Sequence, residues 1–151
     1  MSVGIGYDSH RFAEGRPLIL GGVEIEHERG LSGHSDADVL THAVIDALLG
    51  AAGGGDIGTL FPDDDERWRD ANSVDLLRTA VGTIGGRILN IDATLICEAP
   101  RLAAHRTEME RILAEATSAR VSIKATTNEG MGWIGRGEGI ACIAVASVES
   151  E

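Results

Sequence analysis

The chain has 151 residues, of which 43% are hydrophobic and 25% charged, and its formal charge is −11 from 13 basic and 24 acidic residues. This composition is typical of a globular protein and excludes a disordered chain, while the negative charge argues against binding of bare nucleic acid. The two cysteines form no C-x-x-C pair, and the sequence shows neither a secretory leader nor a run of about 18 apolar residues. We therefore expect one cytoplasmic domain over residues 1–151 with no membrane partner.

The first third of the chain predicts a strand, a hairpin and a helix. The strand covers Ser2–Tyr7, and the apolar stretch Leu18–Ile25, interrupted by Gly21-Gly22, predicts a hairpin or bulged pair. The helix covers Ala37–Ala52, because Ser35–Asp38 has the S-x-x-D capping pattern and apolar residues follow at helical spacing.

The rest of the chain predicts a long loop followed by further helices and strands. Polar residues predict a long loop over Asp56–Asn72, a length that is often functional in small domains. Periodicity and turn residues predict the other elements: helices over Ser73–Ile84 and from Pro100 to Thr117, and strands over Arg87–Cys97, Val121–Ala125 and Gly139–Val148. This order predicts an α+β sandwich with a mixed four-stranded core sheet, helices mainly on one face and a short hairpin.

Asp8, His10 and His42 have the chemistry of an open zinc site. A strand has a period of two, so Asp8 and His10 lie on the same face, and the predicted helix can offer His42 as a third ligand. Three protein ligands with one vacant position are typical of catalytic zinc. Each residue also has a simpler explanation, namely a local hydrogen bond for the Asp–His pair and packing for a histidine within a helix.

Asp46 and Asp38 lie one helical turn from His42 on either side. Either carboxylate is therefore placed to accept the second ring N–H of His42, as a metal-bound histidine usually requires.

Two further segments have features of phosphate sites. His34 and Ser35 precede the N-terminus of the first helix, where free N–H groups attract anions; they are otherwise a loop residue and a cap. The glycine-rich segment after Lys124 permits close backbone approach, and its threonines and Glu129 can contact phosphate and Mg²⁺; it is otherwise a flexible hairpin. Gly4-x-Gly6 lacks the third glycine of a dinucleotide-binding fingerprint, so that function is excluded.

Taken together, the chain resembles the 2-C-methyl-D-erythritol 2,4-cyclodiphosphate synthases of the non-mevalonate isoprenoid pathway. The resemblance extends over nearly the whole chain. Six strings occur in the order and spacing of that family: Gly4-x-Gly6-Tyr7-Asp8-x-His10, Gly33–Asp38, Asp56–Gly58, Phe61–Asp63, Ala99–Arg101 and Gly135–Ala141.

The resemblance implies a homotrimeric lyase with active sites between neighbouring subunits. It implies that Asp8, His10 and His42 hold Zn²⁺, and that Glu129 holds Mg²⁺ or Mn²⁺ together with the substrate phosphates. The substrate would be 4-diphosphocytidyl-2-C-methyl-D-erythritol 2-phosphate, and the products would be the cyclic diphosphate and CMP. His34 and Thr127 match the positions that stabilise the transition state.

The resemblance also implies three groups of binding residues. The substrate-binding residues would be Asp8, His10, His34, Ser35, Asp56, Ile57, Gly58, Phe61, Pro62, Asp63, Asp64, Asp65, Trp133 and Arg136. The nucleotide-binding residues would be Cys97, Glu98, Ala99, Pro100, Arg101, Leu102, Ala103, Thr126, Thr127, Asn128 and Glu129. Trp133, Arg136 and Glu138 would line a central cavity that can hold an isoprenoid diphosphate.

Two other functions are compatible with the same residues. A zinc phosphoesterase would use a zinc-bound water and release inorganic phosphate without a cyclic product. A non-enzymatic trimer would bind an isoprenoid diphosphate through Arg136 and the apolar cavity.

Overall fold

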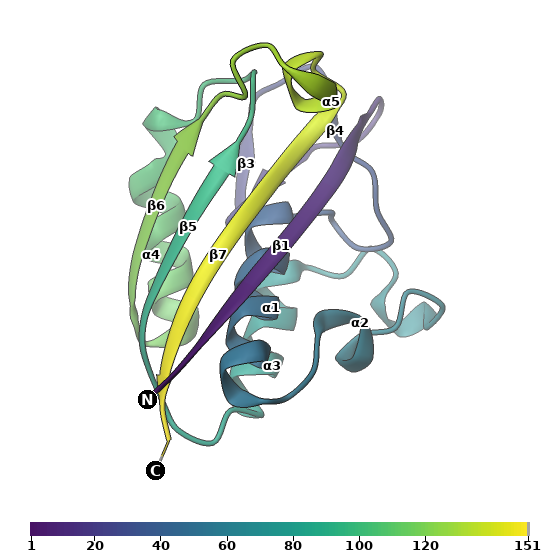
Figure 1. Cartoon of the computed structure of the whole chain (residues 1–151). Coiled ribbons are helices and arrows are strands. Elements are labelled where there is room, and N and C mark those ends of the chain that lie inside the picture. Colours follow the sequence, from purple (N-terminus) through teal and green to yellow (C-terminus); the bar gives the residue numbers. More distant parts are fainter. Residues whose placement is uncertain (151) are drawn as a thin grey trace.

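A mixed five-stranded sheet in the order β4-β1-β7-β5-β6 forms the centre of the computed structural model, which describes residues 1–150 (Figure 1). Its strands are β1 (Ser2–Ala13), β4 (Gly30–Leu31), β5 (Arg87–Ile96), β6 (Arg120–Thr126) and β7 (Gly139–Glu149). β5 and β6 are parallel, and the other pairs are antiparallel. The expected count of four strands is one too few, because β4 has two residues and is too short to show a periodicity. The domain expected over residues 1–151 ends one residue outside the described part.

The long helices cover one face of this sheet, so the predicted α+β architecture is confirmed (Figure 1). They are α1 (Val39–Ala52), α3 (Ser73–Gly82) and α4 (Arg106–Thr117). The hydrophobic core lies between them and the sheet, and it includes Leu48 of α1, Leu77 of α3 and Leu113 of α4, each fully buried. None of the helices within residues 1–150 combines the length and hydropathy needed to cross a membrane.

Two glycines allow α1 to lie directly against β1. A Cβ atom on Gly4 would be 2.1 Å from the carbonyl oxygen of Ala47, and one on Gly6 would be 1.9 Å from that of Ala43. Both distances are far below van der Waals contact, so only glycine permits this approach. The close packing places His42, which precedes Ala43, beside Asp8 and His10, the next residues on the same face of β1.

The predicted hairpin is confirmed and is tied to the start of α1. β2 (Leu18–Leu20) and β3 (Val23–Ile25) pair through Gly21 and Gly22, which have φ values of +57° and +76°. The fully buried carboxylate of Asp38 accepts hydrogen bonds from both glycine N–H groups, at 2.9 and 2.8 Å, and from the N–H of Thr41 at 3.0 Å. Asp38 therefore fixes the hairpin to the helix that it caps.

Several predicted helix starts were wrong. α1 begins at Val39 with Asp38 as its N-cap, because Ala37 has a φ of +58° and cannot belong to the helix. Asn72 rather than Ser73 caps α3, since its side chain accepts the hydrogen bonds from the first turn. That helix also ends two residues before Ile84, at Gly82.

The third helix starts six residues after the predicted Pro100. The chain first brings Leu102 into the core, where it is 4% exposed, then forms the 3-10 turn η2 (Ala103–His105) and only then begins α4. The predicted loop over Asp56–Asn72 contains two short helical turns, α2 (Ile57–Leu60) and η1 (Glu66–Trp68). The glycine-rich segment after Lys124 contains a third, α5 (Gly132–Gly135).

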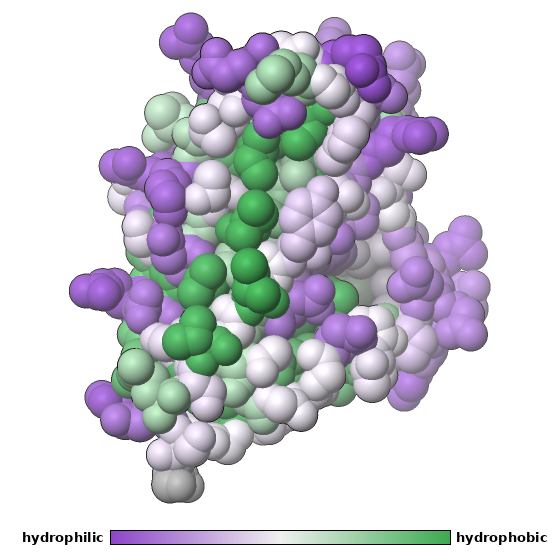
Figure 2. Space-filling view, in the orientation of Figure 1, coloured by the Kyte–Doolittle hydropathy of each residue, from purple (hydrophilic) through white to green (hydrophobic). Residues whose placement is uncertain are grey.

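The face of the sheet opposite the helices carries an exposed apolar stripe. Figure 2 shows hydrophobic residues over β1 and β7 on this side of the molecule. The stripe consists of Val3, Ile5, Tyr7, Ile143 and Val145. Ile5 lies opposite Val145 in the β1–β7 register, so the stripe crosses both strands.

Candidate active site

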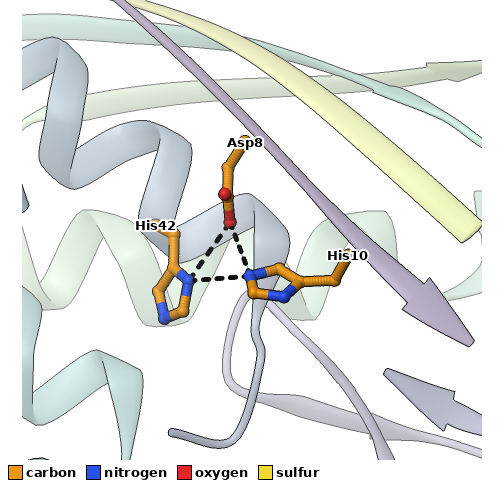
Figure 3. A group of neighbouring side chains, drawn as sticks. All are labelled: Asp8, His10 and His42. Carbon is orange, nitrogen blue, oxygen red and sulfur yellow. Dashed lines mark hydrogen bonds and ion pairs between the residues drawn. The ribbon is translucent and has the colours of Figure 1, made fainter. Parts of the chain in front are cut away.

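Asp8 and His10 of β1 meet His42 of α1 at one point, as Figure 3 shows. The Oδ2 atom of Asp8 lies 2.8 Å from Nε2 of His10 and 3.2 Å from Nδ1 of His42. The two ring nitrogens are 3.2 Å apart. β1 continues beyond the predicted Tyr7 to Ala13, so Asp8 and His10 lie within a regular strand that fixes their common direction.

The other ring nitrogens of both histidines already have partners. Nδ1 of His10 donates to the carbonyl oxygen of Ser32 at 2.8 Å, and Nε2 of His42 donates to the Oγ atom of Ser73 at 2.8 Å. The remaining ring nitrogens therefore face each other and the carboxylate. When both nitrogens are unprotonated, their lone pairs point to the same place, an arrangement that a cation stabilises. One carboxylate and two imidazoles suit a borderline divalent metal such as zinc.

The same three side chains perturb one another's protonation. Burial raises the pKa of Asp8, but hydrogen bonds and charges from His10 and His42 outweigh it and hold that pKa below its ordinary value. Burial lowers the pKa of His10, yet the hydrogen bond and charge of Asp8 raise it overall. The proton that His10 takes up in the metal-free protein must leave when a metal binds.

The polar residues behind His42 differ from those expected. Asp46 accepts a hydrogen bond from the N–H of Ile57 at 2.8 Å, and Asp38 caps α1. Their predicted contact with the ring of His42 was therefore wrong.

Serine hydroxyls take this place instead. Ser73 lies at 2.8 Å from Nε2 of His42 and Ser35 at 3.1 Å, and Asp36 accepts the hydroxyl proton of Ser73. The contact between Ser73 and His42 joins positions 31 residues apart, so no local spacing reveals it.

A cavity of about 260 Å³ opens beside the three ligands. It is lined by Asp8, His10, Gly33, His34, Ser35, His42, Ile57, Gly58, Phe61, Asp63, Trp68 and Leu76. Eight of the fourteen predicted substrate-binding residues thus line one cavity, among them the predicted zinc ligands Asp8 and His10. The sequence interpretation missed Trp68 and Leu76, although the aromatic ring of Trp68 stands out in a polar loop and packs on Phe61 with ring centres 5.0 Å apart.

Other predicted residues of this group have structural contacts around the cavity. Asp56 caps α2 through the N–H of Thr59, and Asp65 pairs with Arg67. Nε2 of His34 donates to the carbonyl oxygen of Asp65 at 3.1 Å, which holds the acidic loop against the start of the first helix. Asp56, Pro62, Asp64 and Asp65 are not among the residues that line the cavity within the described chain.

The predicted nucleotide-binding segments lie side by side at another place. β5 and β6 are parallel and end together, and the N–H of Cys97 donates to the carbonyl oxygen of Thr126 at 2.9 Å. Glu98 also accepts a hydrogen bond from the N–H of Asn128 at 2.7 Å. Within residues 1–150, neither segment contributes to the lining of the cavity beside Asp8, so Thr127 and Glu129 are not brought to the predicted zinc ligands of the same chain.

A second, smaller cavity of about 200 Å³ lies near the start of β7, lined by Ser9, His10, Arg11, Trp133 and Glu138. Arg136, the third residue of this predicted group, donates from Nε to Glu138 at 2.8 Å. His10 lines both cavities and therefore lies between them.

A family match agrees with the fold and the site and identifies the class of protein. The model of the YgbB family matches residues 1–149, so the chain belongs to this family. The 2-C-methyl-D-erythritol 2,4-cyclodiphosphate synthase of Salinibacter ruber is 54% identical to it over 99% of both chains. That of Rubrobacter xylanophilus is 57% identical over 97% of this chain and 94% of the relative. The chain is thus related over its length to the enzymes that the sequence motifs resemble.

Solved structures agree with these relatives. A structure of 2C-methyl-D-erythritol-2,4-cyclodiphosphate synthase in a CDP-bound form has a TM-score of 0.87 and 38% identity, covering 97% of this chain and 99% of the other. The predicted activity, cyclodiphosphate formation in isoprenoid biosynthesis, is the one that these proteins are named for.

Proposed function

We propose that the chain converts 4-diphosphocytidyl-2-C-methyl-D-erythritol 2-phosphate into the 2,4-cyclodiphosphate and CMP. An oxygen of the 2-phosphate attacks the β-phosphorus, and the bond from this phosphorus to the CMP phosphate oxygen breaks. Both groups belong to one molecule, so positioning and charge neutralisation supply most of the catalysis. The observation that carries the proposal is the meeting of Asp8, His10 and His42 at the wall of a cavity that His34 also lines.

In this proposal Asp8, His10 and His42 hold Zn²⁺. The bound ion would supply Lewis-acid polarisation of the β-phosphate. The chain prepares the ligands for it, since Ser32 and Ser73 occupy the outer ring nitrogens of the two histidines and leave the inner ones free.

Residues around the cavity orient the phosphates and the erythritol. His34 and Ser35 would donate hydrogen bonds to phosphate oxygens, and Ile57, Gly58 and Phe61 would enclose the carbon skeleton. His34 must exchange its contact with the Asp65 carbonyl oxygen for one with substrate, or use its other nitrogen.

The cytidine would bind between Cys97–Ala103 and Thr126–Glu129, where Thr127 would orient the diphosphate. Glu129 would hold Mg²⁺ or Mn²⁺, which would neutralise the phosphates of the CDP group. The relative solved with bound CDP supports a cytidine diphosphate ligand.

A homotrimer with sites between neighbouring subunits completes the proposal. Two observations support it: the nucleotide segments lie apart from the zinc ligands of the same chain, and the apolar stripe on the open face of the sheet needs a cover. Trp133, Arg136 and Glu138 would then face the trimer axis and could receive an isoprenoid diphosphate. The cytoplasm remains the predicted location.

Phosphorus NMR of the purified protein with substrate, Zn²⁺ and Mg²⁺ tests the proposal. We expect cyclic diphosphate and CMP in equal amounts, and neither product with His42→Ala. Release of inorganic phosphate without cyclic product would instead indicate a zinc phosphoesterase. Zinc-loaded, folded protein that forms no product would contradict the proposal and favour binding of isoprenoid diphosphate.

A further inference from the structure

Glu98 joins the two segments that follow β5 and β6. Its Oε1 atom accepts hydrogen bonds from the N–H of Asn128 at 2.7 Å and from the N–H of Gly130 at 3.4 Å. The intervening N–H, that of Glu129, donates to Oγ1 of Thr127 at 3.2 Å. Three successive amides of this turn thus donate to two side chains.

The turn needs these contacts because its backbone adopts an unfavourable conformation. Glu129 has a φ of +55° and Gly130 a φ of +73°. The left-handed region is disfavoured for any residue with a Cβ atom, so Glu129 adopts it only where its surroundings hold it there. Successive amides in such a turn form a concave site for an anion, and the carboxylate of Glu98 occupies it.

We propose that Glu98 is a positioning residue for the reaction. It accepts hydrogen bonds from the two N–H groups that flank Glu129, and so it fixes the backbone conformation of Glu129. That conformation directs the Glu129 carboxylate toward the divalent cation. It also couples that carboxylate to the cytidine segment, since Glu98 directly follows Cys97 at the end of β5. The inference rests on the role proposed above for Glu129.

Two variants separate positioning from a direct metal role. Glu98→Ala removes the acceptor, so the turn relaxes, the Mg²⁺ concentration for half-maximal activity rises and kcat falls, each about 10-fold. Glu98→Gln keeps an oxygen that accepts hydrogen bonds from both N–H groups. It should therefore restore most of the wild-type kcat and Mg²⁺ dependence. A ligand role for Glu98 would instead require its charge, and Gln would then be as poor as Ala.

Glu110→Ala is the matched control. Its carboxylate also accepts a backbone N–H, that of Ile123 at 3.3 Å, but it ties α4 to β6 away from the turn. We expect wild-type Mg²⁺ dependence for this variant. Zinc content should be unchanged in all three variants.

Hydrogen–deuterium exchange gives a readout that does not depend on activity. In Glu98→Ala the peptide containing residues 127–131 should exchange at least about 10-fold faster, and Glu98→Gln should restore its protection. Unchanged exchange in Glu98→Ala would overturn the proposal, as would faster exchange with a wild-type Mg²⁺ response. Wild-type protein that forms no product would contradict the proposed function, and exchange would still decide whether Glu98 holds the turn.

Discussion

At the scale of single residues, the orientation of His42 depends on a chain of hydrogen bonds. Nε2 of its ring donates to Ser73, and Ser73 donates to Asp36, which also accepts from the N–H of Ser73 at 3.0 Å. The carboxylate therefore fixes which hydroxyl lone pair faces the ring. The partners of a metal-bound histidine set its tautomer and its basicity.

Ser73→Ala should weaken zinc binding about 10-fold, because Nε2 of His42 loses its nearest acceptor. Competition with a chromophoric chelator measures the affinity. Asp46→Asn is the control, since its Oδ1 atom contacts Ile57 and not His42, and its affinity should equal that of wild type. Weaker zinc binding in Asp46→Asn with no change in Ser73→Ala would show that Asp46, and not Ser73, supports His42.

Cys97 should resist alkylation in the native protein. Its side chain is 6% exposed, and burial raises the pKa of the thiol to about 11. The thiol also donates a hydrogen bond to the carbonyl oxygen of Ala99. Little thiolate is therefore present at pH 8. Mass spectrometry after iodoacetamide treatment should find Cys97 unmodified, while the protein unfolded in guanidinium should be labelled at both Cys97 and Cys142. Rapid native labelling of Cys97 would contradict this.

At the scale of elements, the contact between β1 and α1 builds the candidate metal site. Gly4 and Gly6 admit the helix backbone, and the next residues on the same face of the strand are Asp8 and His10. The alternation of a strand thus places two small positions under the helix and two ligands beside His42.

Gly6→Ala should destabilise the fold by about 1–3 kcal/mol, because its Cβ atom would lie 1.9 Å from the carbonyl oxygen of Ala43 and displace α1. Zinc affinity should fall with it. Gly50→Ala is the matched control, since the nearest atom to its Cβ would be 3.8 Å away and alanine favours a helix by about 0.5–1 kcal/mol. Urea unfolding of both variants measures the difference, and equal midpoints would contradict the packing argument.

At the scale of the whole molecule, the uncovered face of the sheet is the surface through which the proposed trimer would form. Helices cover one face. On the other face Ile5 is 70% exposed and lies between the exposed Val3 and Tyr7 at alternate positions of β1. Figure 2 shows hydrophobic residues over β1 and β7 on this face. A continuous exposed apolar stripe favours contact with another protein surface. In the proposed trimer this contact brings the nucleotide segments of one chain to the zinc ligands of its neighbour.

Ile5→Glu should convert the proposed trimer into monomers, because it places a charge within the apolar contact. Light scattering with size-exclusion chromatography should show the mass falling to that of one chain, and cyclase activity should be lost with it. Thr107→Glu, on exposed α4 on the other side of the sheet, should leave both unchanged. An active Ile5→Glu monomer would exclude sites shared between subunits.

Local patterns predicted much of this protein. The alternation of β1, the helical spacing before Ala52 and the glycines of the hairpin predicted these elements, and the motif around Asp8 and His10 predicted two of the three ligands. Each of these features depends on neighbours only a few residues away. Two of the three wrong helix starts have a common cause, since Asn72 and Asp38 compete with Ser73 and Ser35 for capping and only the folded chain decides between them.

The sequence by itself determined the family, the main elements and the residue types of the predicted ligand set, because these follow from periodicity and from motifs of fixed spacing. The tertiary structure alone decided that Ser73 supports His42, that Trp68 and Leu76 line the cavity, and that Glu98 holds the turn around Glu129. The Ser73–His42 and Glu98–Asn128 contacts join residues 31 and 30 positions apart in the chain. Their distance depends on how helices and strands pack, which no local spacing encodes.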